Sequence, residues 1–180
     1  MRRVFVAVLG LALAATRAQA ADIGIGPYGG VSIPVLNDLS KQGTTFGIRV
    51  PVNLIPLLTV EPFYAGSTLG DAEENFGTPI TYTRDGGKTT GFGVSALLTF
   101  GTGIFKFYPL AGIGSYKFER EGAEDISEIG YNLGLGFGVS PIPKLMVHVR
   151  GEFNMITNGD TAVKAANATV GATYAVFSLP

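Results

Sequence analysis

The sequence predicts an all-β protein: an eight-stranded antiparallel transmembrane up-and-down β-barrel that follows a cleaved signal peptide. First, 46 % of the 180 residues are hydrophobic and only 15 % are charged, whereas soluble domains average about 25 % charged residues. Second, beyond the N-terminus no uninterrupted apolar run reaches the ~20 residues of a membrane helix. Third, apolar residues alternate with small or polar ones, and this period of two indicates strands.

The N-terminus has the three parts of a secretory signal peptide. Arg2 and Arg3 form a positive start, Val4 to Ala15 is a short apolar stretch, and Ala18-Gln19-Ala20 fits a cleavage site. We therefore expect residues 1–20 to be a Sec signal peptide and residues 21–180 to form a single barrel domain. Acidic residues then outnumber basic ones, which does not favour nucleic acid as a partner. The absence of cysteine excludes disulfides and thiol catalysis.

Eight stretches alternate in this way, separated by glycine, proline or charge clusters. Prolines inside several of them (27, 51, 62 and 109) predict bulges or strand ends, because proline cannot donate to a ladder. We expect strands at residues 23–33, 44–54, 57–65, 90–100, 105–118, 129–139, 144–155 and 165–177.

The connections between these strands alternate between short and long. Because the strand count is even, all short turns and both termini lie at one end of a barrel, and all long connections lie at the other. This asymmetry is typical of bacterial outer-membrane barrels. The longest connection, residues 66–89, is expected to extend as a hairpin around residues 78–87.

A soluble barrel that binds a lipid-like ligand is the main alternative, since it shows the same period with the faces reversed. Two features favour a barrel whose outer surface faces lipid. Glycines crowd the polar faces, where a narrow lumen needs small residues: Gly91, Gly93, Gly134, Gly136 and Gly138. Aromatic residues gather near both strand ends, as at two membrane interfaces: Phe46, Tyr64, Phe118, Tyr131 and Phe153 toward the long connections, and Phe100, Phe105, Phe107, Phe137 and Phe177 toward the short turns.

Three consecutive segments resemble a known family. They are Tyr108-Pro-Leu-Ala-Gly-Ile-Gly-Ser-Tyr116, the glycine-rich segment Ile129 to Val139, and Lys144-Leu-Met-Val-His-Val-Arg-Gly-Glu-Phe153. The pattern is similar to the outer-membrane β-barrel domain family, which includes the OmpA barrel, OmpX and the opacity proteins. The resemblance implies an eight-stranded barrel inserted by the outer-membrane assembly machinery.

The chain departs from this family pattern at its C-terminal end. Family barrels usually end on an aromatic residue, whereas here Phe177 is followed by Ser178-Leu179-Pro180. Phe177 is also out of phase with Tyr174 and Val176. The eighth strand reaches the end of the sequence, so an OmpA-like peptidoglycan-anchoring domain is not expected.

Charged residues on the polar strand faces predict a cluster in the lumen. Buried charges are tolerated only when paired, so the favoured interpretation is a salt-bridge plug, and a gate for a small ion path is the alternative. Catalysis by His148, the single histidine, is disfavoured, because Arg150 rather than a serine lies two residues after it and no aspartate lies in the predicted membrane strands. One histidine also argues against a zinc site. The predicted lumen charge cluster consists of Arg49, Glu61, His148, Arg150 and Glu152.

The long connections are acidic, and their spacing does not match a calcium-binding loop. We interpret these residues as a hydrated surface; the alternative is bridging through divalent cations to lipopolysaccharide phosphates. The residues are Asp71, Glu73, Glu74, Glu119, Glu121, Glu124 and Asp125, with Glu128 and Arg120 beside them.

The sequence therefore predicts a protein of the bacterial outer membrane without enzymatic activity or cofactor, and with a structural or surface-interaction role. The alternatives are a secreted soluble barrel that binds a lipid-like ligand and a lipid-modifying barrel enzyme. Expected partners are outer-membrane lipids, lipopolysaccharide, the barrel assembly machinery and an unidentified surface ligand. The protein is expected to be a monomer.

Overall fold

A computed structural model of the chain describes residues 22–35, 41–75, 81–84, 86–101, 103–119, 125–158 and 161–178. The predicted signal peptide lies outside these residues. Within the described ranges, no helix is long and apolar enough to cross a membrane.

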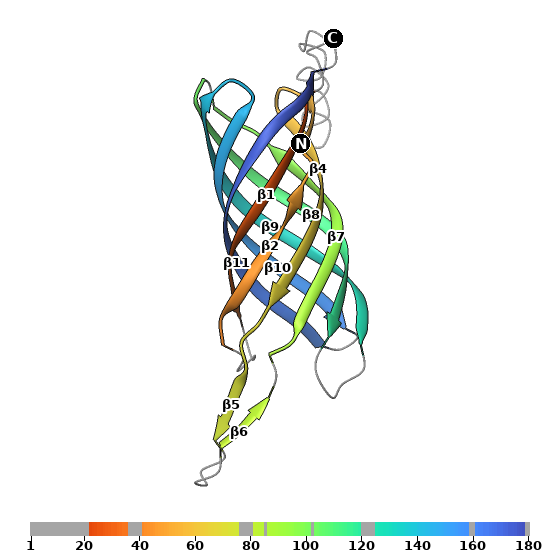
Figure 1. The fold of residues 1–180 in the computed structure, drawn as a ribbon. Helices are drawn as coiled ribbons and strands as arrows, with labels where there is room; N and C mark the ends of the chain where they lie inside the picture. Colours follow the sequence, from red (N-terminus) through yellow and green to blue (C-terminus); the bar gives the residue numbers. More distant parts are fainter. Residues whose placement is uncertain are drawn as a thin grey trace, which may run out of the picture.

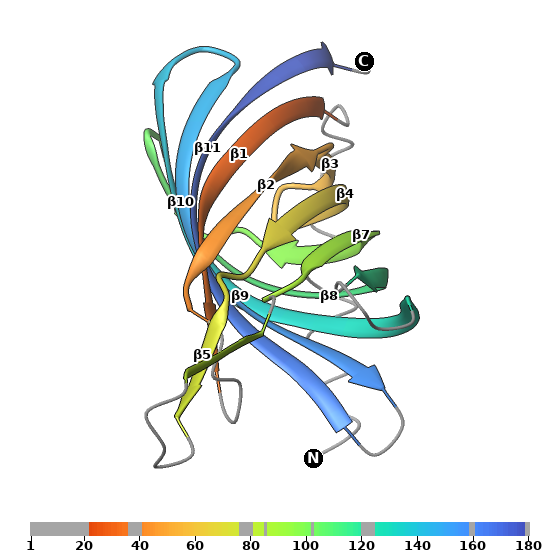
Figure 2. The same cartoon turned by 60° about the horizontal axis from the view of Figure 1, so that its bottom comes forward.

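The described residues form eleven strands, nine of them in one continuous antiparallel sheet with the order β11-β10-β9-β8-β7-β4-β2-β1-β3. The sheet closes because β1 also pairs with β11. The strand β3 continues β2 and pairs with the same two neighbours, β1 and β4. The nine strands therefore form a barrel of eight staves, where a stave is one position around the wall, occupied by a single strand or by β2 and β3 together (Figures 1 and 2). The strands are β1 (Asp22–Pro34), β2 (Gly43–Arg49), β3 (Val52–Ile55), β4 (Leu58–Thr68), β5 (Ala72–Asn75), β6 (Thr81–Arg84), β7 (Lys88–Leu98), β8 (Phe105–Glu119), β9 (Ile126–Ile142), β10 (Leu145–Asn158) and β11 (Thr161–Ser178).

Of the four prolines expected to disturb strands, only Pro51 lies at a break in a stave. The stretch expected as one strand at 44–54 divides at Val50 and Pro51 into β2 and β3. The expectation was wrong for the prolines at 27, 62 and 109, which stay inside paired strands. A proline removes one N–H donor but keeps its carbonyl, and the Pro62 carbonyl accepts the N–H of Val50 at 2.9 Å.

A β-bulge explains the phase of the last aromatic residue. Along the seam between β1 and β11, Ile23 pairs with Phe177 but Gly24 pairs with Ala175, so β11 contains one extra residue. Both residues at the bulge, Val176 (47 % exposed) and Phe177 (64 % exposed), consequently face outward. The aromatic residue thus joins the outer wall despite its position in the sequence.

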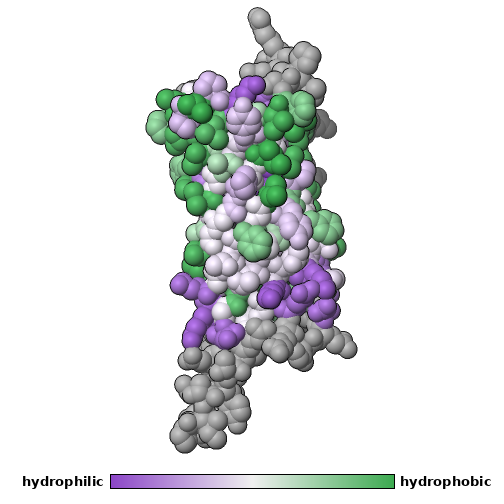
Figure 3. Space-filling view, viewed as in Figure 1, coloured by the Kyte–Doolittle hydropathy of each residue, from purple (hydrophilic) through white to green (hydrophobic). Residues whose placement is uncertain are grey.

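The outer wall of the barrel is apolar and its interior is polar, the reverse of a soluble lipid-binding barrel. Figure 3 shows hydrophobic residues over the half nearest the short turns and hydrophilic ones at the opposite end. One expected belt residue, Phe118, is only 7 % exposed and faces the interior, because it shares the phase of Tyr108 and Tyr116 on β8. Outward-facing large residues include Ile25, Phe46, Ile48, Tyr64, Phe92, Val94, Phe105, Ile113, Tyr131, Leu133, Leu135, Phe137, Val147, Val149, Val170 and Tyr174.

The longest connection carries a second, two-stranded sheet formed by β5 and β6. It projects beyond the end of the barrel that is opposite the short turns (Figure 1). A hairpin was expected there, and the structure starts it earlier in the chain, at Ala72. Strands β8 and β9 also extend farther toward this end than expected, so Glu119 and Glu128 are strand residues.

Candidate functional site

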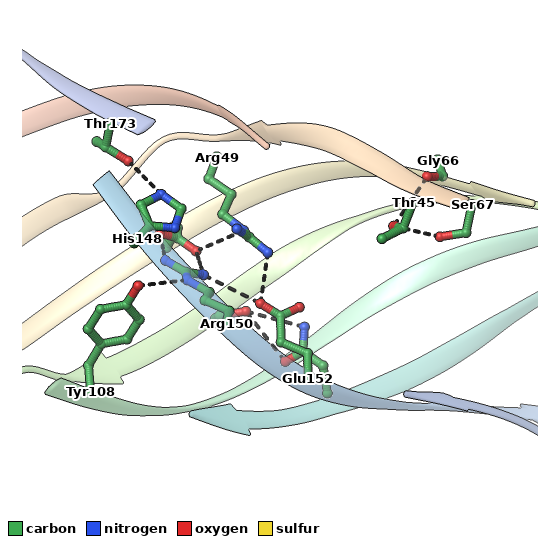
Figure 4. A network of polar contacts seen from close by, with 12 residues as sticks. Thr45, Arg49, Gly66, Ser67, Tyr108, His148, Arg150, Glu152 and Thr173 are labelled. Carbon is green, nitrogen blue, oxygen red and sulfur yellow. Dashed lines mark hydrogen bonds and ion pairs between the residues drawn. The ribbon is translucent and has the colours of Figure 1, made fainter. Parts of the chain in front are cut away.

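A layer of paired charges crosses the middle of the lumen. Arg49 lies on β2, Glu61 on β4, and Arg150 and Glu152 on β10. Each occupies an alternate position of its strand that faces inward, as the period of a strand dictates. The structure brings these four residues together from three staves. Figure 4 shows Arg49, Arg150 and Glu152 pointing toward one another in the lumen.

Arg150 is the centre of this layer. Its Nη1 and Nη2 atoms donate to the two carboxylate oxygens of Glu61 at 2.6 and 2.7 Å, a bidentate pair. Its Nε atom donates to the Tyr108 hydroxyl at 3.1 Å. All three residues are nearly inaccessible to solvent, at 4 %, 2 % and 1 % exposure. The two charges are therefore compensated by direct hydrogen bonds rather than by water.

Arg49 forms the second half of the layer. Its Nη2 atom donates to Glu152 Oε1 at 2.8 Å, and its Nε atom lies 3.7 Å from Glu61 Oε1. The guanidinium carbon also lies 3.5 Å from the centroid of the Tyr28 ring, a cation–π arrangement. Glu152 Oε1 is 3.5 Å from Nη1 of Arg150, so the two ion pairs are joined into one network.

Sequence reasoning missed the aromatic residues of this network, Tyr28 and Tyr108. Both occupy inward positions, and each lies opposite a glycine of the next strand: Tyr28 pairs with Gly47, and Tyr108 pairs with Gly136. A Cβ atom built on Gly136 would overlap the Tyr108 ring. An aromatic residue in phase with a facing glycine is thus the sequence signal for a ring lying across the lumen.

His148 lies beside the layer rather than within it. Its Nε2 atom lies 3.2 Å from Thr173 Oγ1 on β11, and the side chain is 2 % exposed (Figure 4). Among the described residues, no carboxylate lies within ion-pair distance of its imidazole. The Thr173 hydroxyl therefore holds the imidazole at Nε2, and within the described part of the chain Nδ1 has no hydrogen-bond partner.

The charged layer separates two cavities. The cavity on the short-turn side measures about 370 Å³, and the one on the side of the long connections about 50 Å³. Glu61 and Arg150 line both. The smaller cavity is also lined by Arg49, Asn154 and Asn167, each with a buried polar atom that has no protein partner. Such a space has the polarity and volume that ordered water requires.

Three of the predicted acidic residues of the long connections, Asp71, Glu119 and Asp125, have described side chains. Lys117 pairs with Glu119 at 2.7 Å and Asp125 at 2.8 Å, and all three side chains are about half exposed. Asp71 accepts the N–H of Gly86 at 3.4 Å. The side chains of Glu73 and Glu74 and the whole of Glu121 and Glu124 lie outside the described parts. In those parts, no group of three or more potential ligands is placed to hold a metal ion.

The fold and the sequence both match known outer-membrane proteins. Neisserial surface protein A has a TM-score of 0.67 at 18 % identity, with 86 % of this chain and 96 % of that chain covered. The N-terminal β-barrel domain of Pseudomonas aeruginosa OprF has a TM-score of 0.55 at 13 % identity, covering 87 % and 99 %.

Ail, the attachment invasion locus protein of Yersinia pestis, gives a TM-score of 0.51 at 21 % identity, covering 88 % and 99 %. Comparison with the curated proteins found no match. The model of the outer membrane protein beta-barrel domain matches residues 4–175. With its closed antiparallel barrel and apolar wall, the chain belongs to the outer membrane protein β-barrel domain family.

Proposed function

We propose that this outer-membrane barrel is a non-enzymatic surface-interaction protein, exported through its N-terminal Sec signal peptide and acting through its long connections. The observation that carries this proposal is the β5–β6 hairpin, which projects beyond the barrel at the end away from the short turns (Figure 1). In barrels of this kind, short turns face the periplasm and long connections face the outside. The hairpin would then be the part of the protein that reaches other molecules first.

The lumen supports an interaction role over transport. Four mutually compensating charged side chains cross it, and the cavity beyond them holds only about 50 Å³. A metabolite would have to break a bidentate ion pair to pass. His148 contacts the Thr173 hydroxyl, and no described carboxylate pairs with its imidazole, which supports a non-enzymatic role.

Two related structures bear names that fit such a role, a neisserial surface protein and an attachment invasion locus protein, the second solved with the heparin analogue sucrose octasulfate. The long connections of this chain are rich in acidic residues, which favours a partner of a different charge. Asp71 and Asp125 are exposed at the outer end, and Asp125 shares Lys117 with Glu119. We infer a neutral or basic surface ligand rather than a sulfated polysaccharide. Outer-membrane lipids, lipopolysaccharide and the assembly machinery are the other proposed partners, for a monomeric barrel.

The orientation is tested by cysteine labelling, since the natural chain contains no cysteine. Ala72→Cys at the start of the hairpin should react with a membrane-impermeant maleimide on intact cells. Lys144→Cys, in the turn between β9 and β10, should react only after the outer membrane is permeabilised. Labelling of Lys144→Cys on intact cells would contradict the proposed orientation.

The interaction role is tested by removing the hairpin alone. Residues 72–84 are replaced by a short Gly-Ser linker, and adherence to epithelial cells is compared with that of cells expressing the intact protein at equal levels. Adherence should fall to the level of cells without the protein, while the migration of the barrel on gels still changes on boiling. Unchanged adherence with a folded barrel would contradict a role for this connection.

A further inference from the structure

The half of the lumen nearest the short turns contains a cavity the size of a ligand pocket. Its volume is about 370 Å³, and small-molecule sites in proteins measure about 300–1,000 Å³. Glu61, Arg150 and Tyr108 form its inner end, where the charged layer closes the lumen. Its other end is formed by strand residues next to the short turns, such as Asp22, Ile55 and Ser140, and by Lys144 in the turn that precedes β10. The cavity therefore opens at the end of the barrel with the short turns.

Two lysines line this cavity, and no described carboxylate pairs with either of them. Lys106 occupies an inward position near the start of β8, and Lys144 lies in the turn between β9 and β10. The two lie on neighbouring staves, since β9 pairs with both β8 and β10. Neither ammonium group lies within ion-pair distance of a carboxylate in the described part of the chain.

The remaining charges of the cavity do not neutralise these lysines. Glu61 is occupied by both terminal nitrogens of Arg150. Asp22 lies at the start of β1, four staves from β8 in either direction around the barrel and therefore on the wall opposite Lys106. Lys144 is nearer to it, because the Lys144 carbonyl accepts the N–H of Ala175 on β11, the neighbour of β1. Among the described residues that line the cavity, three are cationic (Lys106, Lys144 and Arg150) and two are anionic (Asp22 and Glu61). The cavity therefore has an excess of positive charge, and a narrow cleft of low dielectric concentrates such a potential.

We propose that this cavity binds a small organic dianion, a dicarboxylate or a phosphate monoester, that enters from the short-turn end. The two lysines would pair with its charged groups, and the side chains of Asn53 and Ser140 would donate hydrogen bonds to it. Leu97, Leu145 and Met146 supply apolar surface for its carbon skeleton. The site lies at the opposite end of the barrel from the hairpin, so it is independent of the surface role.

The test uses the barrel purified from outer membranes in detergent and labelled with ¹⁵N. Succinate and methyl phosphate are titrated at constant ionic strength, and succinamide serves as the uncharged match of succinate. At least one dianion should shift the amide signals of residues around Lys106 and Thr173 with saturation at a midpoint of about 1 mM or below. Succinamide should not shift these signals. Neither anion should shift the amide signals of residues at the other end of the barrel, such as Lys88.

The matched variants remove equal charge from different places. Lys106→Gln combined with Lys144→Gln should weaken binding about ten-fold or more. The control variant combines Lys88→Gln with Lys164→Gln, since both lysines lie at the other end of the barrel. This variant should change the affinity for the anion less than about two-fold. Migration on gels before and after boiling shows that each variant is folded. Equal weakening in both pairs, non-saturating shifts, or equal binding of succinamide would overturn the proposal; the last comparison needs only the natural protein.

Discussion

At the scale of single residues, the interior of this barrel depends on how charge and ring size are matched to glycine. Each of the three guanidinium nitrogens of Arg150 donates a hydrogen bond, two to Glu61 and one to Tyr108. The Tyr108 ring fits because Gly136 has no side chain. A buried ion pair adds little to folding stability compared with apolar residues of equal volume, but removing one partner leaves the other charge buried and uncompensated. The layer is therefore sensitive to loss of one member.

Arg150→Ala should destabilise the barrel, because it leaves the Glu61 carboxylate buried with only the 3.7 Å contact to Arg49. The expected loss is about 3–5 kcal/mol of unfolding free energy, measured by urea unfolding in lipid vesicles. Lys88→Ala, at the start of β7, is the control and should have little effect. Combining Arg150→Met with Glu61→Leu should restore much of the loss. An unchanged midpoint for Arg150→Ala would show that the pair does not contribute to stability.

A matched pair of glycine substitutions on adjacent strands tests the packing of the lumen. Gly136→Ala on β9 directs a methyl group into the Tyr108 ring, whereas Gly151→Ala on β10 directs one outward into open space. Overpacking of this kind costs about 1–3 kcal/mol, so the first variant should unfold at lower urea concentration and the second should match the natural protein. Equal midpoints would contradict the inward packing of Tyr108.

At the scale of strands, most of the fold follows from alternation alone, and the exceptions have local causes. All eight expected stretches became staves, because a period of two places one face in lipid and one in the lumen. The break at Pro51 could be expected, but its restriction to that proline could not, since it depends on which neighbour each N–H faces. The bulge beside Phe177 is a property of the seam with β1, which local alternation does not contain.

The charged layer was predictable in part for the same reason. Inward phase identifies Arg49, Glu61, Arg150 and Glu152, but which carboxylate pairs with which guanidinium depends on the stagger between distant staves. His148 shares that phase and still bonds to Thr173 instead. Phe118 was expected in the outer aromatic belt because it lies near a strand end, but its phase along β8 directs it into the lumen.

Strand β9 offers a test of the depth of the wall in the membrane. Leu135→Arg places a charge on the outward face in the middle of the strand, where Leu135 is 53 % exposed. Ile129→Arg places the same charge on the same face near the end of the strand, where Ile129 is 54 % exposed. Arginine costs about 2–4 kcal/mol at the bilayer midplane and about 0–1 near an interface. Unfolding in vesicles should separate the two variants; equal costs would contradict a hydrocarbon layer centred on Leu135.

At the scale of the whole molecule, the lumen is divided into two halves by the layer of Arg49, Glu61, Arg150 and Glu152, whose positive and negative charges cancel. Vesicles containing the protein should therefore not swell faster in isosmotic arabinose than vesicles without it. A general porin measured in parallel provides the positive control, and a shift in migration on boiling confirms that the barrel is folded. Swelling at a rate near that of the porin would contradict a closed lumen.

The seam between β1 and β11 has a consequence for how the molecule is made. It joins residues from the two ends of the described chain, with Asp22 opposite Ser178. Every other pair of adjacent staves can form by local hairpin or near-neighbour pairing, but this one requires the largest loop closure in the protein, and such contacts form slowly. Until residue 178 has been delivered, β1 has an open edge with unpaired N–H and C=O groups, which hydrocarbon does not tolerate. Closure of the barrel is therefore a post-synthetic event, and the first strand to be made waits for the last.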